Sequence, residues 1–197
     1  IVSRPFPTHV KTLRNQKVRY ISCGDEYSTF LTHDGGVFTT GLGSFGQLGH
    51  GTYGNEVLPR KVLELMGTTV SQIACGKRHT MTFLPSRNKI YGFGLGGCGQ
   101  LASGKDYNKS SLPQACTGPW FSNDYEDSQL TIKRIFAGGD HCLVSLSHGI
   151  ETDDYRVFSN DRQIWSLTKE LSENCAKCEA MVPVDLDIMT AIEVIFK

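Results

Sequence analysis

Short segments rich in β-branched and aromatic residues recur along the first two thirds of the chain, with glycine-rich turns between them. Residues 18–23, 27–32 and 37–40 are three such segments, and each predicts a short β-strand. The turn at 33–36 ends in two glycines, which adopt positive φ without steric cost. Residues 59–65 are the last predicted element of this unit.

The pattern repeats. Cys23 is followed 52 positions later by Cys75, and after the turn the offset grows to 53, as between Gln47 and Gln100. One residue is therefore inserted in the turn of the second copy. A third copy opens at residue 132 with an offset of 62, so about ten additional residues precede it when judged against a fixed period. Apolar matches upstream of residue 17 indicate that the chain begins inside a unit.

Several short strands in each repeat predict an all-β radial architecture. We expect the blades of a partial propeller over residues 1–150. The inserted segment 103–130 has the composition of a loop, and Trp120 and Phe121 are its predicted anchors.

The pattern changes after residue 150, where glycine no longer occurs. Ile164, Leu167 and Leu171 recur at helical spacing. A second such run includes Ile188 and Ile192. We therefore predict a helical linker region over 151–197, truncated at its end.

Charge and composition exclude some classes of function. The net charge is zero, which argues against nucleic acid as a partner, since a nucleic-acid site needs a basic face. No apolar run is long enough for a membrane span. The seven cysteines are odd in number, and Cys23 and Cys75 share one repeat position. This favours small buried residues over disulfides and indicates a reducing compartment.

No residue pattern predicts catalysis, a cofactor or a metal. The segments 41–46 and 94–99 match the glycine pattern of dinucleotide sites, but no helix follows to receive a phosphate. Cys175 and Cys178 form a single pair, whereas structural zinc needs four ligands. His79 recurs as His141 and is replaced by Tyr27 in the first unit, which favours a buried, hydrogen-bonded structural role.

The remaining repeat positions divide into two sets. The positions to which we assign a structural role are Cys23, Gly24, Gly41, Gly43, Gly46, Gln47, Cys75, Gly76, His79, Gly94, Gly96, Gly99, Gln100, Gly138 and His141. The dipeptides after each Cys/Ala-Gly change charge while their frame stays constant, and loops on a rigid scaffold often bind partners. These candidate partner-binding residues are Asp25, Glu26, Lys77, Arg78 and Asp140. Ordinary surface variation is the alternative interpretation.

The frame V-x-x-I-[AS]-C-G-x-x-[HY]-[ST], followed by [VI]-[FY]-x-x-G-x-G-x-x-G-Q-L-[GA], resembles the regulator-of-chromosome-condensation repeat over roughly residues 5–150. Segments such as 62–67 and 72–80 further resemble the last repeats of the small HERC ubiquitin ligases. Ala102 and Tyr27 depart from the usual glycine and histidine.

The resemblance implies a seven-bladed propeller, then helical linkers and a catalytic HECT domain that lies outside these 197 residues. By the same resemblance the parent protein would be cytoplasmic, and the segment itself would be non-catalytic and would recruit ubiquitination substrates or regulators. Two alternatives remain open, namely a nucleotide-exchange factor for a Ran-type small GTPase and a non-enzymatic scaffold.

Overall fold

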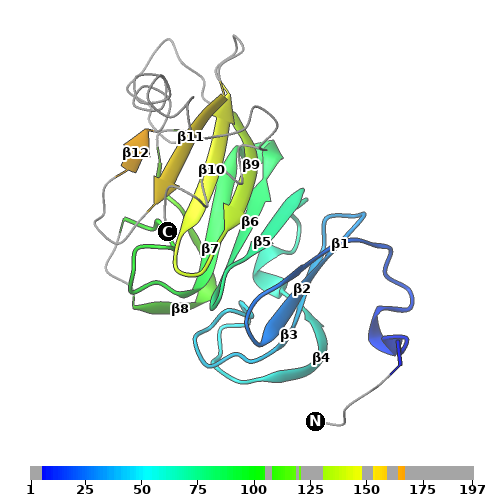
Figure 1. Cartoon of the computed structure of the whole chain (residues 1–197). Coiled ribbons are helices and arrows are strands. Elements are labelled where there is room, and N and C mark those ends of the chain that lie inside the picture. Colours follow the sequence, from blue (N-terminus) through cyan, green and yellow to red (C-terminus); the bar gives the residue numbers. More distant parts are fainter. Residues whose placement is uncertain are drawn as a thin grey trace, which may run out of the picture.

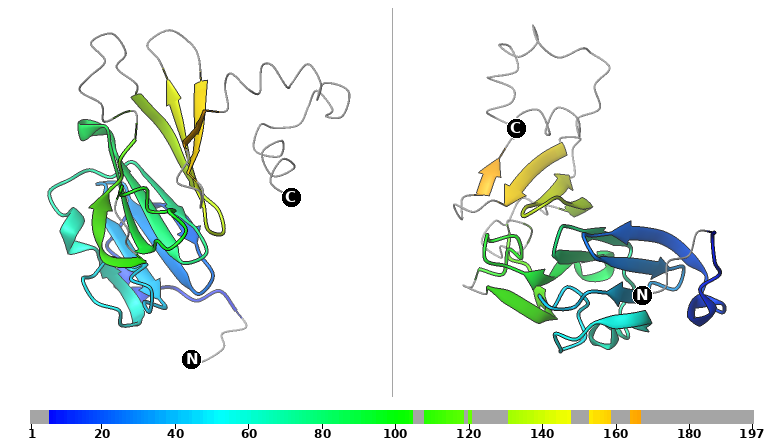
Figure 2. Two further views of the ribbon diagram at one scale, coloured as in Figure 1. Left: turned by 90° about the vertical axis from the view of Figure 1, so that its left-hand side faces the viewer. Right: turned by 60° about the horizontal axis from the view of Figure 1, so that its bottom comes forward.

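The computed structural model describes residues 6–104, 108–118, 120 and 131–147, and two further strands, β11 (Asp153–Phe158) and β12 (Ile164–Ser166). Its strands form three antiparallel four-stranded sheets, in the orders β1-β2-β3-β4, β5-β6-β7-β8 and β9-β10-β11-β12. We name them blades 1, 2 and 3. They stand side by side with β1, β5 and β9 adjacent (Figures 1 and 2).

Each blade follows the chain from its inner to its outer strand. Blade 1 contains β1 (Val18–Cys23), β2 (Tyr27–Thr32), β3 (Val37–Gly41) and β4 (Glu56–Lys61). Blade 2 contains β5 (Gln72–Cys75), β6 (His79–Leu84), β7 (Lys89–Leu95) and β8 (Lys109–Ala115). Blade 3 begins with β9 (Thr131–Ala137) and β10 (Cys142–Ser147). The short 3-10 helices are η1 (Lys11–Leu13), η2 (Leu63–Leu65) and η3 (Pro85–Arg87). The described part contains no helix long and apolar enough to cross a membrane.

Strand register confirms the repeat. Tyr27 at the start of β2 pairs with Gly41 at the end of β3. In blade 2, His79 at the start of β6 pairs with Gly94 in β7. Equivalent residues thus occupy equivalent places, as the offsets of 52 and 53 predict.

The inserted residue of blade 2 is absorbed in the turn between β6 and β7. There η3 is followed by Asn88, which has a φ of 47°. Its side-chain Oδ1 accepts a hydrogen bond from the N–H of Ile132 at 3.0 Å. The shorter turn of blade 1 makes the equivalent contact with its backbone, because the Gly35 carbonyl accepts from the N–H of Val70 at 3.2 Å. Both turns therefore hold the segment that enters the next blade.

Two apolar cores lie between the blades. Side chains alternate across a strand, so the two faces of a middle blade can serve two neighbours. Ile73 on β5 belongs to the core with Leu31 of blade 1. The next residue, Ala74, belongs to the core with Ile135 of blade 3. Each buried aliphatic side chain contributes roughly 1.5–3 kcal/mol relative to exposure, so the contacts between blades contribute substantially to the stability of the structure.

Three expectations need correction. The segment 103–130 contains strand β8, which includes Pro113; an outer strand tolerates proline because its outer edge is unpaired. The boundary at residue 150 falls between β10 and β11 of one sheet. The helix expected from Ile164 is wrong at its start, since β12 pairs there with β11. Residues 167–197, like Phe121, lie outside the described residues, whereas Trp120 is buried as predicted.

The two repeat cysteines end their strands at equivalent places, but their expected burial is wrong for Cys23. Cys75 ends β5 half-buried, and its thiol lies 3.2 Å from the Thr29 hydroxyl of blade 1. Cys23 ends β1 and is exposed. By the same geometry it lies on the side of blade 1 that faces away from blade 2. In the described part, all five cysteines are free thiols.

Candidate functional site

Three loops that link inner to second strands lie in one continuous row. We name residues 24–26, 76–78 and 138–140 the loop row. The N–H of Asp25 donates to the Lys77 carbonyl at 3.1 Å, and the N–H of Lys77 donates to the carbonyls of Gly138 and Gly139, both at 3.2 Å. The structure thus brings the five predicted partner-binding residues onto one face, from three separate blades.

A ring folds back over the first glycine of each loop. A Cβ on Gly24 would lie 1.9 Å from the Tyr27 ring, on Gly76 2.0 Å from the His79 ring, and on Gly138 2.3 Å from the ring of His141. Real Cβ atoms do not approach other atoms so closely, so no side chain fits there. The G-x-x-[HY] pattern therefore has a steric cause: the ring occupies the space that glycine leaves.

The rings of Tyr27 and His79 join one blade to the next. The Tyr27 hydroxyl donates to the Gly76 carbonyl at 3.2 Å and also contacts the His79 carbonyl. It accepts from the Thr80 hydroxyl at 3.1 Å. Both rings are buried, which confirms the predicted structural role. His141 is exposed, so the prediction of burial is wrong for this third position.

Burial holds these groups in their neutral forms, because an apolar environment disfavours charge. Desolvation raises the pKa of the Tyr27 hydroxyl far above its usual range. Desolvation also lowers the pKa of His79 to about 4, against a smaller opposing effect of the Asp140 carboxylate. The pKa of the Cys142 thiol is raised for the same reason. Near pH 7 none of the three is poised for proton transfer, which fits a structural role.

The two glycine-rich loops that resemble dinucleotide sites share their backbone conformation, and the first of them packs against the next blade. Gly41 and Gly94 share a φ of 112°, and Gly46 and Gly99 have φ values of 86° and 77°. A Cβ on Gly46 would lie 2.4 Å from the carbonyl oxygen of Ser110, on the outer strand of blade 2. The first loop leads into β4 and not into a helix, so it lacks the helix N-terminus that a phosphate site needs.

A buried glutamine side chain accepts a hydrogen bond from the backbone within each of these loops. Gln47 Oε1 accepts from the N–H of Phe45 at 2.9 Å, and Gln100 Oε1 accepts from the N–H of Cys98 at 2.8 Å. A Cβ on Gly43 would lie 1.9 Å from the carbonyl of Gly54. At the equivalent position, the N–H of Gly96 donates to the Asn108 carbonyl at 2.8 Å. The conserved geometry of the two loops is thus explained by packing alone.

The charged side chains of the loop row differ in their surroundings. Arg78 is half-buried, and its guanidinium carbon lies 4.7 Å from the centre of the Phe45 ring of blade 1, a cation–π contact. The others are exposed to solvent, namely Asp25, Glu26, Lys77 and Asp140. The sign of the charge changes from blade to blade along the row. Partner binding by these residues stays a prediction.

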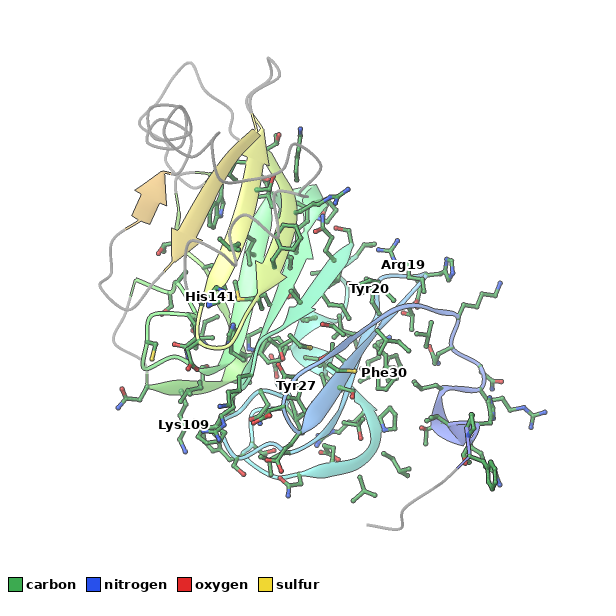
Figure 3. All side chains as sticks on the ribbon, viewed as in Figure 1. Arg19, Tyr20, Tyr27, Phe30, Lys109 and His141 are labelled. Atoms are coloured by element: carbon green, nitrogen blue, oxygen red, sulfur yellow. The ribbon has the colours of Figure 1, made fainter. Side chains whose placement is uncertain are left out.

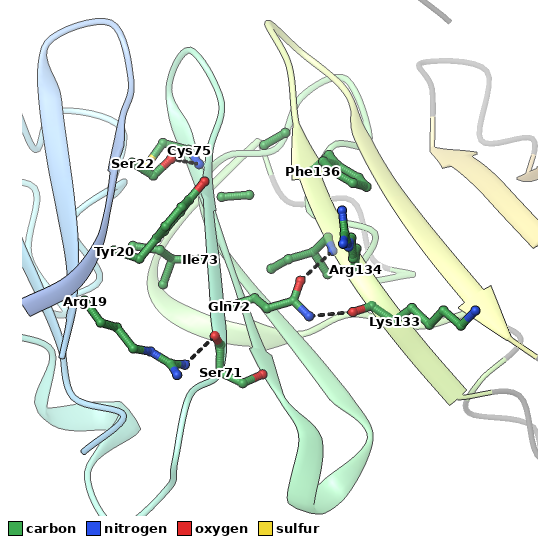
Figure 4. Close-up of a pocket in the computed structure, with 13 residues that line it drawn as sticks. Arg19, Tyr20, Ser22, Ser71, Gln72, Ile73, Cys75, Lys133, Arg134 and Phe136 are labelled. Atoms are coloured by element: carbon green, nitrogen blue, oxygen red, sulfur yellow. Dashed lines mark hydrogen bonds between the residues drawn. The ribbon is translucent and has the colours of Figure 1, made fainter. Parts of the chain in front are cut away.

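A second surface, which sequence reasoning missed, lies between the inner strands. We name it the inner-strand groove. It has a volume of about 580 Å³ and is lined by residues of β1, β5 and β9 and by Ser71 just before β5 (Figure 4). Its described lining includes three cations, Arg19, Lys133 and Arg134, and no Asp or Glu is among these described residues. Figure 3 shows Arg19 toward one end of the blades and Tyr27, beside the loop row, toward the other.

No group of three or more His, Cys, Asp or Glu side chains gathers to hold a metal ion within the described ranges. The Cys175 and Cys178 pair lies outside them. The polar contacts described above use backbone groups, hydroxyls, side-chain amides, a thiol and neutral rings. The arrangement of the described residues therefore offers surfaces for binding.

Comparison with known proteins fits this geometry. Residues 34–83 and 18–47 each match a model of the regulator of chromosome condensation (RCC1) repeat. A search of solved structures finds human WBSCR16, with a TM-score of 0.60 and 26% identity, over 72% of this chain and 33% of that one. A chain in the structure of Kap60 bound to yeast RCC1 (Prp20) gives a TM-score of 0.56 and 25% identity, over 77% and 30%. The protein is built from RCC1-type β-propeller repeats.

Its repeats are similar to those of the HERC proteins. The chain is 44% identical to the probable E3 ubiquitin-protein ligase HERC4 of Homo sapiens over 178 residues, which are 85% of this chain and 17% of that protein. It is 49% identical to human HERC3 over 151 residues, 73% of this chain and 14% of that protein. The chain is thus similar to a segment of these HERC proteins and spans under a fifth of their length.

Proposed function

We propose that this chain is the partner-recruiting propeller segment of a HERC-type ubiquitin ligase. The observation that carries the proposal is the identity of 44–49% to two proteins named as probable ubiquitin ligases, over most of this chain. A scaffold of blades with a charged loop row suits recruitment, because rigid scaffolds commonly present their binding residues on loops. We further propose a ring of seven blades and a cytoplasmic location for the whole protein.

The first experiment asks whether the chain is catalytic. Residues 1–197 are incubated with ubiquitin, activating enzyme and conjugating enzyme, and products are separated with and without reductant. We expect no reducible ubiquitin adduct, because the buried Cys116 and Cys142 have raised thiol pKa values, and thiolates are the reactive species. A thioester on any of the seven cysteines would contradict the assignment.

The second experiment tests recruitment by the loop row. The whole protein that carries this chain is used in a ubiquitination assay with cell-extract proteins as substrates. We expect the double variant Asp25→Lys/Glu26→Lys, or Lys77→Glu, to reduce modification of specific substrates. Thioester formation on the whole protein should be unchanged. Arg87→Glu, an exposed change on η3, is the matched control. An unchanged substrate set in the loop-row variants would contradict recruitment by these loops.

A nucleotide-exchange factor for a Ran-type GTPase is the second candidate, and the likeness to yeast RCC1 favours it. An assay of fluorescent GDP release separates the two functions. On the ligase proposal, the chain does not accelerate release from a Ran-type GTPase. Acceleration that is lost on reversing the loop-row charges would support the exchange function instead.

A further inference from the structure

The inner-strand groove is closed to one common mode of peptide binding. An inner strand has an unpaired edge, which could accept an added strand. At β5 and β9, side chains of the neighbouring blade already bond to backbone groups of these edges. Gln72 donates from Nε2 to the Lys133 carbonyl at 2.5 Å, and its Oε1 accepts from the N–H of Ile135 at 3.1 Å. Ser22 Oγ likewise accepts from the N–H of Cys75 at 3.0 Å. A ligand must therefore be held by side chains.

Three exposed side chains of the groove are cationic, namely Arg19, Lys133 and Arg134. None of the described lining residues is acidic. Arg19 uses Nη2 to bond the Ser71 carbonyl at 2.6 Å, which orients a guanidinium that has further N–H donors. The whole chain is neutral, so the excess of positive charge is local to this groove. Concave walls of one sign concentrate ligands of the opposite sign.

Aromatic side chains stand on opposite walls of the same groove. Tyr20 on β1 is 55% exposed, and Phe136 on β9 is half-buried (Figure 4). The cations are likewise divided, with one on β1 and two on β9. A ligand that meets all of them must extend across β5. This spacing favours an extended chain over a single small anion.

We propose that the inner-strand groove binds an extended acidic peptide segment of a partner protein. Its carboxylates pair with Arg19, Lys133 and Arg134, and its apolar groups lie against Tyr20 and Phe136. Nucleic acid is a less suitable ligand, because the affinity of a protein for nucleic acid grows with the number of phosphates that its cations neutralise. The described part of this groove offers only three cations in a chain of zero net charge. The groove cations lie away from the loop row, so this inference goes beyond the proposed function and does not depend on it.

The test measures fluorescence anisotropy of a labelled peptide, in which Asp alternates with Ser, added to the full chain. The peptide with Asn in place of Asp is the uncharged control. We expect only the acidic peptide to bind. Lys133→Glu and Arg134→Glu should each weaken binding about three- to tenfold, as expected when an exposed ion pair becomes a repulsion. Raising the salt from about 0.05 M to about 0.5 M should also weaken it.

Arg87→Glu on η3 is the matched charge control and should leave binding unchanged. Because charge reversal could disturb the blades, Lys133→Gln and Arg134→Gln are measured too, and thermal melting checks each variant. Equal binding of the two peptides, or full binding by both glutamine variants, would overturn the proposal. A short single-stranded DNA that binds more tightly than the acidic peptide and is displaced by neither peptide would also overturn it.

Discussion

The ring of His79 in blade 2 reaches blade 3, where its Nε2 lies 3.0 Å from the Sγ of Cys142. Tyr27 and Thr80 stand in the same relationship one blade earlier, with their hydroxyls 3.1 Å apart. Two different chemical pairs thus make one contact between blades. The Tyr/His exchange in the repeat is consequently matched by a Thr/Cys exchange in the next unit.

His79 makes stability depend on pH. Its pKa falls from 6.5 to about 4 on folding, mainly through desolvation. Between these values the unfolded chain binds a proton that the folded ring does not, so stability is lost as pH drops from about 6.5 to 4, by about 3 kcal/mol in total. Urea unfolding at about pH 7.5, 6.0 and 5.0 starts above that window and extends into it. The free energy of unfolding should fall at each step.

His79→Gln should flatten the dependence on pH, because its amide does not titrate. The pKa of His50 is also lowered by burial. The free energy of unfolding of His79→Gln should therefore still fall with pH, but less steeply than in the parent chain. His33→Gln, at an exposed position, is the control and should keep the full slope. An identical slope in His79→Gln and the parent chain would show that this ring is not the sensor.

Gly76→Ala should be strongly destabilising. Its Cβ would lie 2.0 Å from His79 Cε1 and 2.5 Å from the Gly138 carbonyl oxygen, so a ring or a loop must move. We expect a loss of about 2–4 kcal/mol in the free energy of unfolding. Adding His79→Ala removes one of the two obstacles, so the double variant should lose less than the sum of the single losses.

Gly54→Ala is the control for that series, because nothing lies within 4 Å of its Cβ. It should change the free energy of unfolding by under about 1 kcal/mol. Chemical denaturation of all four variants measures these values. Additive losses for Gly76→Ala and His79→Ala would mean that the ring does not impose the glycine.

Replacing Ala102 should increase the stability of the chain. It has a φ of 45°, whereas Gly49 at the same place in blade 1 has 74°. A left-handed backbone conformation costs a non-glycine residue roughly 1–2 kcal/mol. Glycine avoids this cost, but it loses part of the gain because its unfolded chain has more conformational freedom. Ala102→Gly should therefore stabilise the chain by about 0.5–1 kcal/mol.

Ala115→Gly, in the extended strand β8, is the matched control and should destabilise. Melting temperatures of the two variants give the comparison directly. Destabilisation of similar size by both changes would show that Ala102 carries no backbone strain.

The exposure of Ile21 leads us to predict that the chain self-associates. It is 53% exposed, although Ile73 and Ile135 at the same repeat position are 4% and 5% exposed. A blade face that is apolar and uncovered favours association. We expect light scattering to show oligomers of residues 1–197, and Ile21→Lys to reduce them. Leu63→Lys, at 58% exposure on η2, is the control. A monomer at all concentrations would contradict this prediction.

The repeat allowed much of the fold to be predicted. Because Tyr27 and His79 share a repeat position, the offset alone predicts equivalent places for both at the start of a strand. The failures occur where the repeat is weak. Strand β8 was hidden by serines and Pro113, which only an edge strand tolerates. Three residues at Ile164–Ser166 are too few for spacing to distinguish strand from helix.

The two candidate surfaces differ in how they could be found. The charged dipeptides of the loop row stand out because their frame repeats around them. The inner-strand groove has no comparable signal, since Arg19 and Arg134 lie 115 positions apart and meet only through packing of blades. Aligning the three inner strands does place Arg19 with Lys133 and Ile21 with Ile135. That alignment could have indicated a shared cationic lining.

The loops of the loop row are bonded to one another through main-chain atoms alone: the N–H of Asp25 to Lys77, and the N–H of Lys77 to Gly138 and Gly139. Every amino acid except proline supplies the same N–H and carbonyl. The hydrogen bonds between the loops therefore do not depend on the side chains at the second loop position, where Asp, Lys and Gly are all found. At the third position Arg78 also packs on Phe45 of blade 1. A gene encoding such repeats could change the exposed side chains of these loops by point mutation while each blade kept its shape.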